Sequence, residues 1–362
     1  MKKVFKIMLK VLLIILSILI LFLLVHFIIH KIKSKNEYNE LKDLGYINLY
    51  SAGDYNLNLY RIGDPNSKHK LIALSGLGVH NYSVEMSFVN EELKEDYEII
   101  YIDRAGYGYS DDTSTKQSIE QIVSDYRMVL QNAGIDGPYI LLPHSLGGVY
   151  ATYWESMYPD EIEGVILIDT SELGLDAWDS KEYKVSILNY LSLFACKLGL
   201  QRFVLHHYYY PIPSYYSKTE QKISDDFNTH STVTKASLSE LKEINNNGNK
   251  AYHNIKTNDI PKIYISASSG FREIDDLKAY IKWVNERKKE IGLKANPNPS
   301  DEILKEVIQE HIKWENERIK PYIDLLGNTE IIYLPGDHMI FEQKPYELAQ
   351  IIKEFIGSLN QS

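Results

Sequence analysis

The sequence predicts an α/β protein with a mostly parallel, doubly wound sheet, an inserted helical segment and one membrane-spanning helix ahead of the sheet. Two observations carry this prediction. Short apolar runs, bounded by glycine or charged residues, alternate with segments of helical periodicity, as they do where helices cover both faces of a parallel sheet. One of these runs also turns abruptly into a helix around Ser145, within the segment 143–148.

An uncharged apolar stretch near the N-terminus, Val11–Ile29, predicts the membrane helix. At about 1.5 Å rise per residue, a helix of this length reaches roughly 28 Å, close to the thickness of a bilayer core. Lysines flank both ends and no small-residue cleavage pattern follows. An uncleaved anchor over residues 1–35 is therefore favoured over a signal peptide or a buried core helix. Residues 34–44 are predicted to form a short polar tether.

The orientation of this helix rests on its lysines, which are slightly more numerous before the span than after it. The positive-inside rule favours a single-pass protein of the cell membrane, with its N-terminus inside and the main domain extracellular. The single cysteine, Cys196, excludes an internal disulfide framework and fits either side of a bacterial membrane. A net charge of −10 argues against a nucleic-acid partner.

Apolar runs predict the strands of the sheet. They lie at 70–74, 97–102, 139–142, 164–168, 261–266 and 329–334. Helical periodicity over Ser118–Ala133, with Gly134 as a stop signal, and over Val149–Met157 places helices between them, and a last helix opens at Pro345. We therefore expect one core that is made of residues 36–171 and 259–362.

Two segments exceed this core, residues 172–258 and 271–328. In the second segment, Ser300 stands before Asp301 and Glu302 in the pattern of a helix start. The sequence does not decide whether this second segment packs beside the first or binds a partner.

The segment Pro143-His144-Ser145-Leu146-Gly147-Gly148 joins a predicted strand to a predicted helix. A turn of this kind strains the serine backbone and lifts the hydroxyl clear of the sheet. The two glycines let the helix pass close by, and the helix N-terminal amides point at the space above the serine. The usual pattern is G-x-S-x-G, and Pro143 departs from it. An ordinary strand-to-helix turn is the alternative interpretation.

Four motifs occur in a fixed order along the chain. They are Ser75-Gly76-x-Gly78, Asp103-Arg104-x-Gly106-x-Gly108-x-Ser110, His144-Ser145-x-Gly147-Gly148 and Gly336-Asp337-His338. In this order the chain resembles the α/β-hydrolase superfamily, and its serine esterases and lysophospholipases in particular. The resemblance covers about residues 46–171 and 259 to the C-terminus, and it rests on the whole set rather than on any one motif.

The resemblance implies a catalytic triad in the chain order serine, acid, histidine. Ser145 is the expected nucleophile, and His338 is the expected base because imidazole accepts a proton near neutral pH. The acid is Asp169, which directly follows a predicted strand, or alternatively Asp275, which stands further beyond the next strand. Asp169 is favoured. His144 is expected to be structural, because adjacent residues of the turn point in different directions.

The resemblance also implies an oxyanion hole that is made of the backbone N–H groups of Leu77 and Leu146. Ser75 stands where the family often has histidine, which changes the surroundings of these donors but leaves the donors themselves possible. We expect Asp103 and Arg104 to fix the turn after their strand and to take no part in the chemistry.

In this family a segment placed like 172–258 commonly forms a lid over the active site. Its aromatic and aliphatic residues either line an apolar acyl pocket or form a small core of the lid itself. These residues are Trp178, Leu191, Leu193, Phe194, Phe203, Val204 and the cluster 208–216. His206 and His207 have no spaced carboxylate or cysteine partners, so no metal is expected, and no cofactor is implied.

Together these features predict a membrane-anchored serine hydrolase that cleaves a carboxylic ester through an acyl-enzyme. A serine at the turn disfavours the haloalkane dehalogenase and epoxide hydrolase branches, which use aspartate there. The expected partners are a small ester or acyl substrate and the membrane. Two alternatives stay open: a hydrolase of short peptides or amides, and a non-catalytic receptor that retains the fold. The receptor is favoured by Pro143, by Ser75 and by the ambiguous acid.

Overall fold

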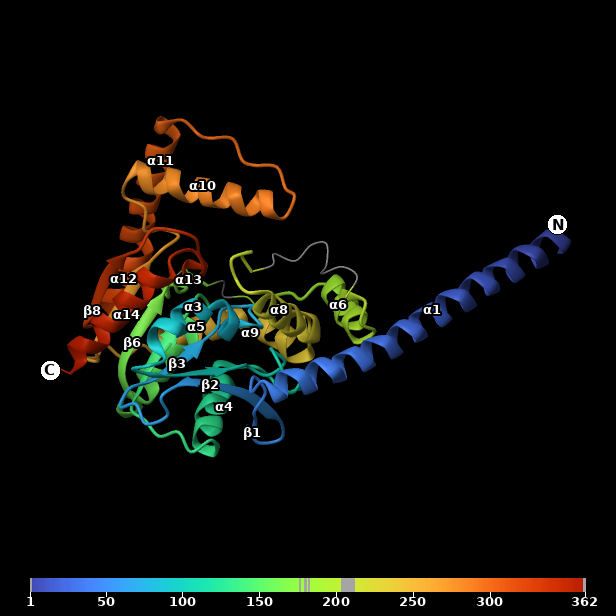
Figure 1. The fold of residues 1–362 in the computed structure, drawn as a ribbon, viewed down its shortest axis with the longest axis horizontal. Helices are drawn as coiled ribbons and strands as arrows, with labels where there is room; N and C mark the ends of the chain where they lie inside the picture. Colours follow the sequence, from blue (N-terminus) through green and yellow to red (C-terminus); the bar gives the residue numbers. More distant parts are fainter. Residues whose placement is uncertain (1, 176, 179–180, 182, 203–211, 361–362) are drawn as a thin grey trace.

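A computed structural model of the chain describes residues 2–175, 177–178, 181, 183–202 and 212–360. Within these residues eight strands form one sheet, in the order β1-β2-β4-β3-β5-β6-β7-β8. Helices cover both faces of the sheet, and one long helix, α1, projects away from the body (Figure 1). The predicted fold class is confirmed.

The strands from β4 to β8 run parallel, and β1 and β2 are antiparallel at one edge. The bounds are β1 (Leu49–Ser51), β2 (Asn56–Gly63), β3 (Lys70–Leu74), β4 (Glu98–Ile102), β5 (Tyr139–Pro143), β6 (Ile162–Ile168), β7 (Lys262–Ser266) and β8 (Thr329–Tyr333). Every strand predicted from an apolar run is present, within two residues of its predicted ends. Strands β1 and β2 are not among the predicted strands, and the alternating polar and apolar residues of β2 are typical of a half-buried antiparallel strand.

Helices follow most of the strands. Their bounds are α1 (Lys2–Asp43), α2 (Tyr82–Glu85), α3 (Ser87–Leu93), α4 (Ile119–Asn132), α5 (Gly147–Met157), η1 (Pro159–Glu161), α6 (Ile187–Lys197), α8 (Lys218–Ser231), α9 (Lys235–His253), α10 (Ile274–Glu290), α11 (Asp301–Trp314), η2 (Glu315–Ile319), α12 (Lys320–Leu326), α13 (Ile340–Gln343) and α14 (Pro345–Leu359). The predicted helices at 118–133 and 149–157, and the one that opens at Pro345, are all confirmed.

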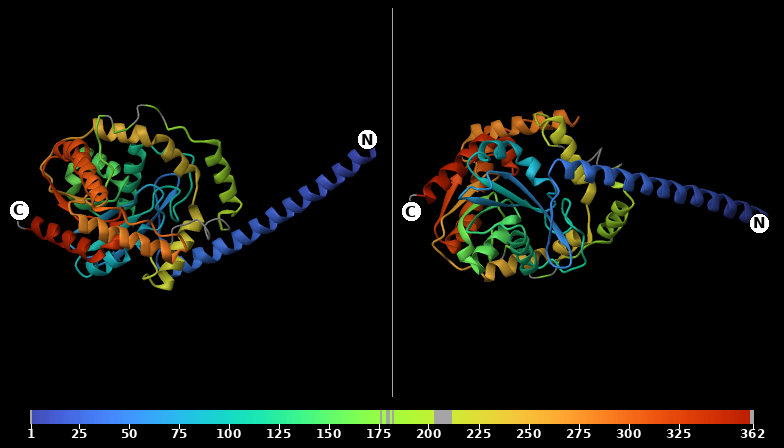
Figure 2. Two further views of the ribbon diagram at one scale, coloured as in Figure 1. Left: turned by 90° about the horizontal axis from the view of Figure 1, so that it is seen from above. Right: turned by 60° about the horizontal axis from the view of Figure 1, so that its bottom comes forward.

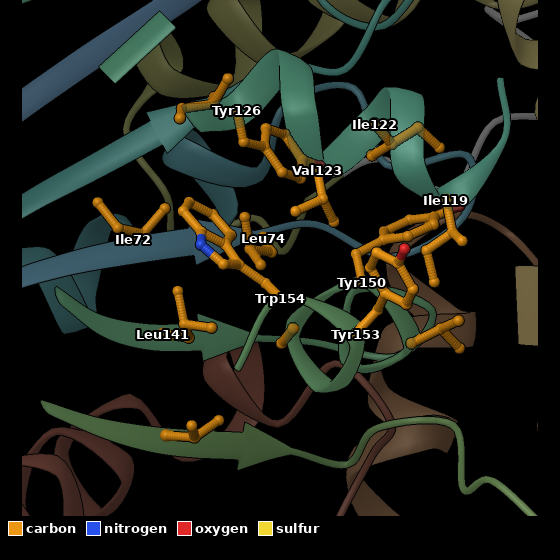
Figure 3. Packing of buried hydrophobic residues seen from close by; sticks show 14 of the residues in the cluster. Ile72, Leu74, Ile119, Ile122, Val123, Tyr126, Leu141, Tyr150, Tyr153 and Trp154 are labelled. Carbon is orange, nitrogen blue, oxygen red and sulfur yellow. The ribbon is translucent and has the colours of Figure 1, made fainter. Parts of the chain in front are cut away.

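Strand β3 shows why the sheet is buried on both faces. Ile72 and Leu74 belong to the apolar cluster under α4 and α5, whereas Leu71 and Ala73 belong to the cluster under α3 and α14. Figure 3 shows the first of these clusters, with Trp154 from α5 among the side chains of α4 and the strands. Both faces of the strand are apolar, as expected for a parallel sheet between two helical layers.

The predicted polar tether, residues 34–44, is wrong, because α1 continues as one helix to Asp43. Its last turns pack against the body: Leu41 is buried, and the ring of Tyr38 lies 6.0 Å from that of Tyr109. On another face of α1, Glu37 accepts hydrogen bonds from Arg202 at both carboxylate oxygens, at 2.7 and 2.6 Å. Polar residues over this stretch form one side of a packed helix rather than a solvated linker.

The N-terminal part of α1 is different, since most of its large apolar side chains are exposed from Val4 to Ile32. Among the described residues, α1 is the one helix that is long and apolar enough to cross a membrane, by length and composition.

The segment 172–258 carries α6, α8 and α9, and the segment 271–328 carries α10, α11, η2 and α12. Ser300 caps α11 as predicted, and its hydroxyl accepts a hydrogen bond from the N–H of Ile303 at 3.4 Å. The two segments touch, because Ser214 donates to Glu290 at the end of α10 at 2.9 Å.

The aromatic and aliphatic residues of 172–258 have different surroundings. Tyr216 is buried in a cluster with α1 and α2, which fits the interpretation as a core of the segment itself. Leu191 and Phe194 are exposed on the surface. Phe203, Val204 and 208–211, like His206 and His207, lie outside the described residues.

Removal of the Trp154 side chain tests the core between α4, α5 and the sheet. Trp154 is fully buried, stacks 6.0 Å from Tyr126 and donates to Glu161 at 2.9 Å. We expect Trp154→Ala to lower the free energy of unfolding by about 3–5 kcal/mol, measured by urea denaturation of the detergent-solubilised protein. Trp314→Ala is the control, because Trp314 is 46% exposed and its loss should cost less than about 1 kcal/mol. Equal losses would contradict the assigned core.

Candidate active site

Ser145 lies in a strained turn between β5 and α5. Its φ is 52°, in the left-handed region that residues with a side chain rarely adopt. The turn is held by backbone hydrogen bonds, since the Ser145 carbonyl accepts from Gly148 and Ser171 at 3.0 Å. Its own N–H points to the carbonyl of Ile168 at 3.4 Å. The end of β6 therefore stabilises the turn that β5 leaves strained.

Two glycines and one proline make this turn possible. A Cβ on Gly147 would lie 2.3 Å from the carbonyl oxygen of Leu74, and one on Gly148 would lie 2.5 Å from the Cβ of Thr170. Pro143 has no N–H, but it is the last residue of its strand, and the N–H of His144 bonds Leu74 at 2.9 Å in its place. The departure from the usual motif thus leaves strand pairing intact.

Asp169 and His338 meet at the same end of the sheet. Asp169 follows β6 with a φ of 42°, and its Oδ2 lies 2.6 Å from Nδ1 of His338. Its Oδ1 accepts from the N–H groups of Ala267 and Ser268, at 2.9 and 3.1 Å, beyond the end of β7. Both carboxylate oxygens are therefore satisfied, which fixes their direction.

Each of these two groups changes the pKa of the other. Burial alone would raise the pKa of Asp169, but the hydrogen bond and charge of His338, the side chain of Ser268 and the backbone N–H of Ala267 lower it below its ordinary value. Burial would lower the pKa of His338, whereas the hydrogen bond and charge of Asp169 and the charge of Asp337 raise it. With Nδ1–H directed at Asp169, Nε2 is left as the proton acceptor.

His144 is the residue next to Ser145, and it supports the loop that carries His338. Its Nε2 lies 3.0 Å from the backbone carbonyl of His338, and the two rings are 4.5 Å apart. Burial lowers the pKa of His144 to about 3, so the ring is neutral and Nε2 donates a hydrogen bond to the carbonyl. His144 therefore has a structural role, as expected: its hydrogen bond links the Ser145 turn to the loop that carries His338.

The loop after β3 borders Ser145. A Cβ on Gly76 would lie 2.9 Å from the Cβ of Ser145. Within the described part of the chain, the N–H groups of Leu77 and Leu146 donate to no acceptor. Leu146 is buried and Leu77 is 41% exposed. These two N–H groups therefore stay available to a ligand atom.

Arg104 holds this loop in place, which the sequence analysis did not foresee. It is buried, and its Nη1 and Nη2 donate to the carbonyls of Ser75 and Gly76 at 2.7 and 2.8 Å. Its Nε lies 2.8 Å from a carboxylate oxygen of Glu240 in α9. Asp103 does fix the turn as predicted, by accepting from the N–H of Tyr109 at 3.3 Å. Arg104 instead joins the loop after β3 to the segment 172–258.

The structure thus brings Asp169 and His338 into contact beside the Ser145 turn, at the carboxyl ends of β5, β6 and β8. Asp275, the alternative acid, lies in the first turn of α10, and the carboxylate that His338 contacts is that of Asp169. In parallel sheets the carboxyl ends of the strands lie at one edge, where ligands usually bind.

Comparison with known proteins shows which family the chain resembles. A family model described as the alpha/beta hydrolase fold matches residues 71–355. The protein YbdG of Bacillus subtilis strain 168 is 28% identical over 220 residues, which are 59% of this chain and 66% of YbdG. The chain thus spans just under two thirds of this relative.

Two solved structures share the fold at low sequence identity. The epoxide hydrolase CorEH is 16% identical with a TM-score of 0.56, over 86% of this chain and 98% of CorEH. The enol-lactonase from Burkholderia xenovorans LB400 is 14% identical with a TM-score of 0.53, over 86% of this chain and 100% of the lactonase. Because these two proteins catalyse different reactions, the shared fold does not define a substrate.

The contact between Asp169 and His338 predicts a change in a histidine pKa. In Asp169→Asn the charge and the ionic hydrogen bond are lost while burial of the ring remains, so we expect the pKa of His338 to fall below its value in the parent. The measurement is an NMR titration of protein labelled with ¹³C at the histidine Cε1, with His338→Gln to assign the resonance.

Asp275→Asn is the matched control, because it removes the same charge from the other candidate acid. It should leave the His338 pKa unchanged. If the pKa of His338 fell in Asp275→Asn and not in Asp169→Asn, the carboxylate partner of His338 would be Asp275 instead.

Proposed function

Because the chain belongs to the α/β-hydrolase fold family, we propose that it is a membrane-anchored serine hydrolase that cleaves a carboxylic ester. Ser145 is the nucleophile, His338 is the general base and Asp169 is the acid that orients the imidazole. The observation that carries the proposal is the 2.6 Å contact between His338 Nδ1 and Asp169 Oδ2 beside the strained turn of Ser145.

The reaction proceeds in two acyl transfers. His338 Nε2 takes the proton of Ser145 Oγ while Oγ bonds to the ester carbonyl carbon. The N–H groups of Leu77 and Leu146 stabilise the oxyanion of the tetrahedral intermediate. The bond to the alcohol then breaks, and the imidazolium gives its proton to the departing oxygen. In the second transfer His338 activates a water, which releases the acid and restores the Ser145 hydroxyl.

Three features support this assignment besides the triad contact. The N–H groups of Leu77 and Leu146 have no acceptor within the described residues, so they can bind an oxyanion without first breaking a bond. The guanidinium of Arg104 donates hydrogen bonds to two backbone carbonyls of the loop that carries Leu77. These bonds limit the movement of the loop. The net rise in the His338 pKa means that Asp169 favours the imidazolium that forms during the reaction.

A serine at the turn separates this chain from some members of its fold. Relatives with aspartate there open epoxides or displace halide, whereas a serine hydroxyl suits acyl transfer to water. We propose an ester rather than an amide substrate because the segment around Ser145 resembles serine esterases. A short peptide or amide remains the second candidate, and assays on matched ester and anilide substrates separate the two.

The membrane anchor is α1, in a single-pass arrangement at the cell membrane with the catalytic domain outside. Its exposed apolar side chains from Val4 to Ile32 support insertion into a bilayer. The body also contacts the end of this stretch, since His26 lies 2.9 Å from the carbonyl of Gly199. A signal sequence removed after export would lose that contact, which favours a retained helix. In this proposal residues 172–258 form the lid of the hydrolase core.

Labelling with a fluorophosphonate tests the proposed nucleophile. The full-length protein in detergent should be labelled, because His338 activates the Ser145 hydroxyl. Ser145→Ala should abolish labelling, and His338→Ala should slow it by about 10²–10⁴-fold. Mass spectrometry of the modified peptide identifies the site, and hydrolysis of 4-nitrophenyl esters of graded chain length measures turnover.

Ser171→Ala is the control, because it removes a nearby hydroxyl but keeps the backbone N–H that bonds the Ser145 carbonyl. It should be labelled like the parent. If the folded parent resists labelling and yet binds esters without turnover, the receptor alternative replaces the hydrolase. If Ser145→Ala is labelled as fast as the parent, another residue is the nucleophile.

A further inference from the structure

Helix α6 is apolar, and the described residues of the body leave much of its surface exposed. Apart from Asn189, Ser192 and Lys197, its residues are all apolar, and none of them is buried. Leu188, Leu191 and Phe194 are among its most exposed side chains, at 68%, 56% and 62%. A continuous exposed patch of this kind is rare on a soluble surface and marks an interaction site.

The chain that follows α6 is fixed to the anchor helix. His26 Nε2 lies 2.9 Å from the carbonyl of Gly199, two residues after the end of α6. Gly199 packs so tightly here that a Cβ would lie 2.4 Å from the Cβ of His30. Arg202 donates to His30 Nδ1 at 2.9 Å. Figure 1 shows the end of α6 close to α1, and the left view of Figure 2 shows the rest of α6 leading away from it.

These contacts define the level of α6 along the anchor. His26 belongs to the uncharged stretch that ends at Ile29, and Lys31 and Lys33 follow it. On a membrane-spanning α1, the boundary between acyl chains and headgroups therefore falls at the turn that Gly199 touches. The one charged residue of α6, Lys197, lies at its last position, where its amine can reach the headgroups.

We propose that α6 is a second membrane contact, which lies in the interface of the leaflet beside α1 with its exposed apolar side chains among the acyl chains. This inference rests on the proposed anchoring of α1. The bilayer is the occupant rather than a second copy of the chain, because the exposed apolar surface of α6 continues that of α1, and most of the large apolar side chains of α1 are exposed from Val4 to Ile32. An apolar helix with a cation at one end is typical of interfacial helices.

Site-specific fluorescence in vesicles tests the proposal on the full-length chain. Cys196→Ser removes the single cysteine, and one cysteine is then added by Leu191→Cys in α6. Ile20→Cys in α1 is the positive reference and Ile303→Cys in α11 is the control, since Ile20 and Ile303 are 57% and 50% exposed. Each variant carries an NBD label and is reconstituted into phosphatidylcholine–phosphatidylglycerol vesicles, with or without lipids that carry a nitroxide on the acyl chain.

We expect the labels at positions 20 and 191 to emit at shorter wavelength and to be quenched by the acyl-chain nitroxide, and the label at 303 to remain unquenched with emission typical of water. A label at 191 that is not quenched, beside a quenched label at 20, would refute the membrane contact of α6 alone. Blue-shifted emission at 191 without quenching would mean that protein covers the helix, and this also overturns the proposal. Absence of quenching at 20 would instead refute the anchoring of α1, and with it this inference.

Discussion

Burial of both faces of the parallel sheet is the constraint on which the rest of the structure depends. In strand β3, Leu71 and Ala73 belong to the apolar cluster on one face of the sheet, and Ile72 and Leu74 belong to the cluster on the other. Neither face of the sheet is therefore open to a ligand. Chemistry is confined to the ends of the strands. The turn of Ser145 and the side chains of Asp169 and His338 therefore gather at one edge, although they come from distant parts of the chain.

The site at this edge contains local strain that its surroundings stabilise. Ser145 and Asp169 both have positive φ, and both are held by backbone hydrogen bonds from neighbouring strand ends. Gly147 and Gly148 allow the helix to pass close to the sheet, so the strained turn is packed from two sides. A turn fixed in this way holds Ser145 in one position at the end of the sheet.

The segment 172–258 connects α1 to this site. At one end Gly199 and Arg202 contact α1, and in α9 the carboxylate of Glu240 lies beside Arg104, which holds the loop after β3. The position of the body relative to α1 and the loop that carries the Leu77 N–H group are thus linked through one inserted segment. Because these contacts are polar and largely buried, loss of one partner would leave the other without compensation.

The sequence alone determined the parallel strands β3 to β8, the helix over 149–157 and the order of the motifs, because apolar runs and helical periodicity are local properties of a chain. It favoured Asp169 but kept Asp275 as an alternative, since both follow apolar strands, and the contact with His338 is what distinguishes them. It could not show that Arg104 reaches the loop after β3 and α9. Which buried polar groups meet depends on the path of the whole chain, and that is decided only by the tertiary structure.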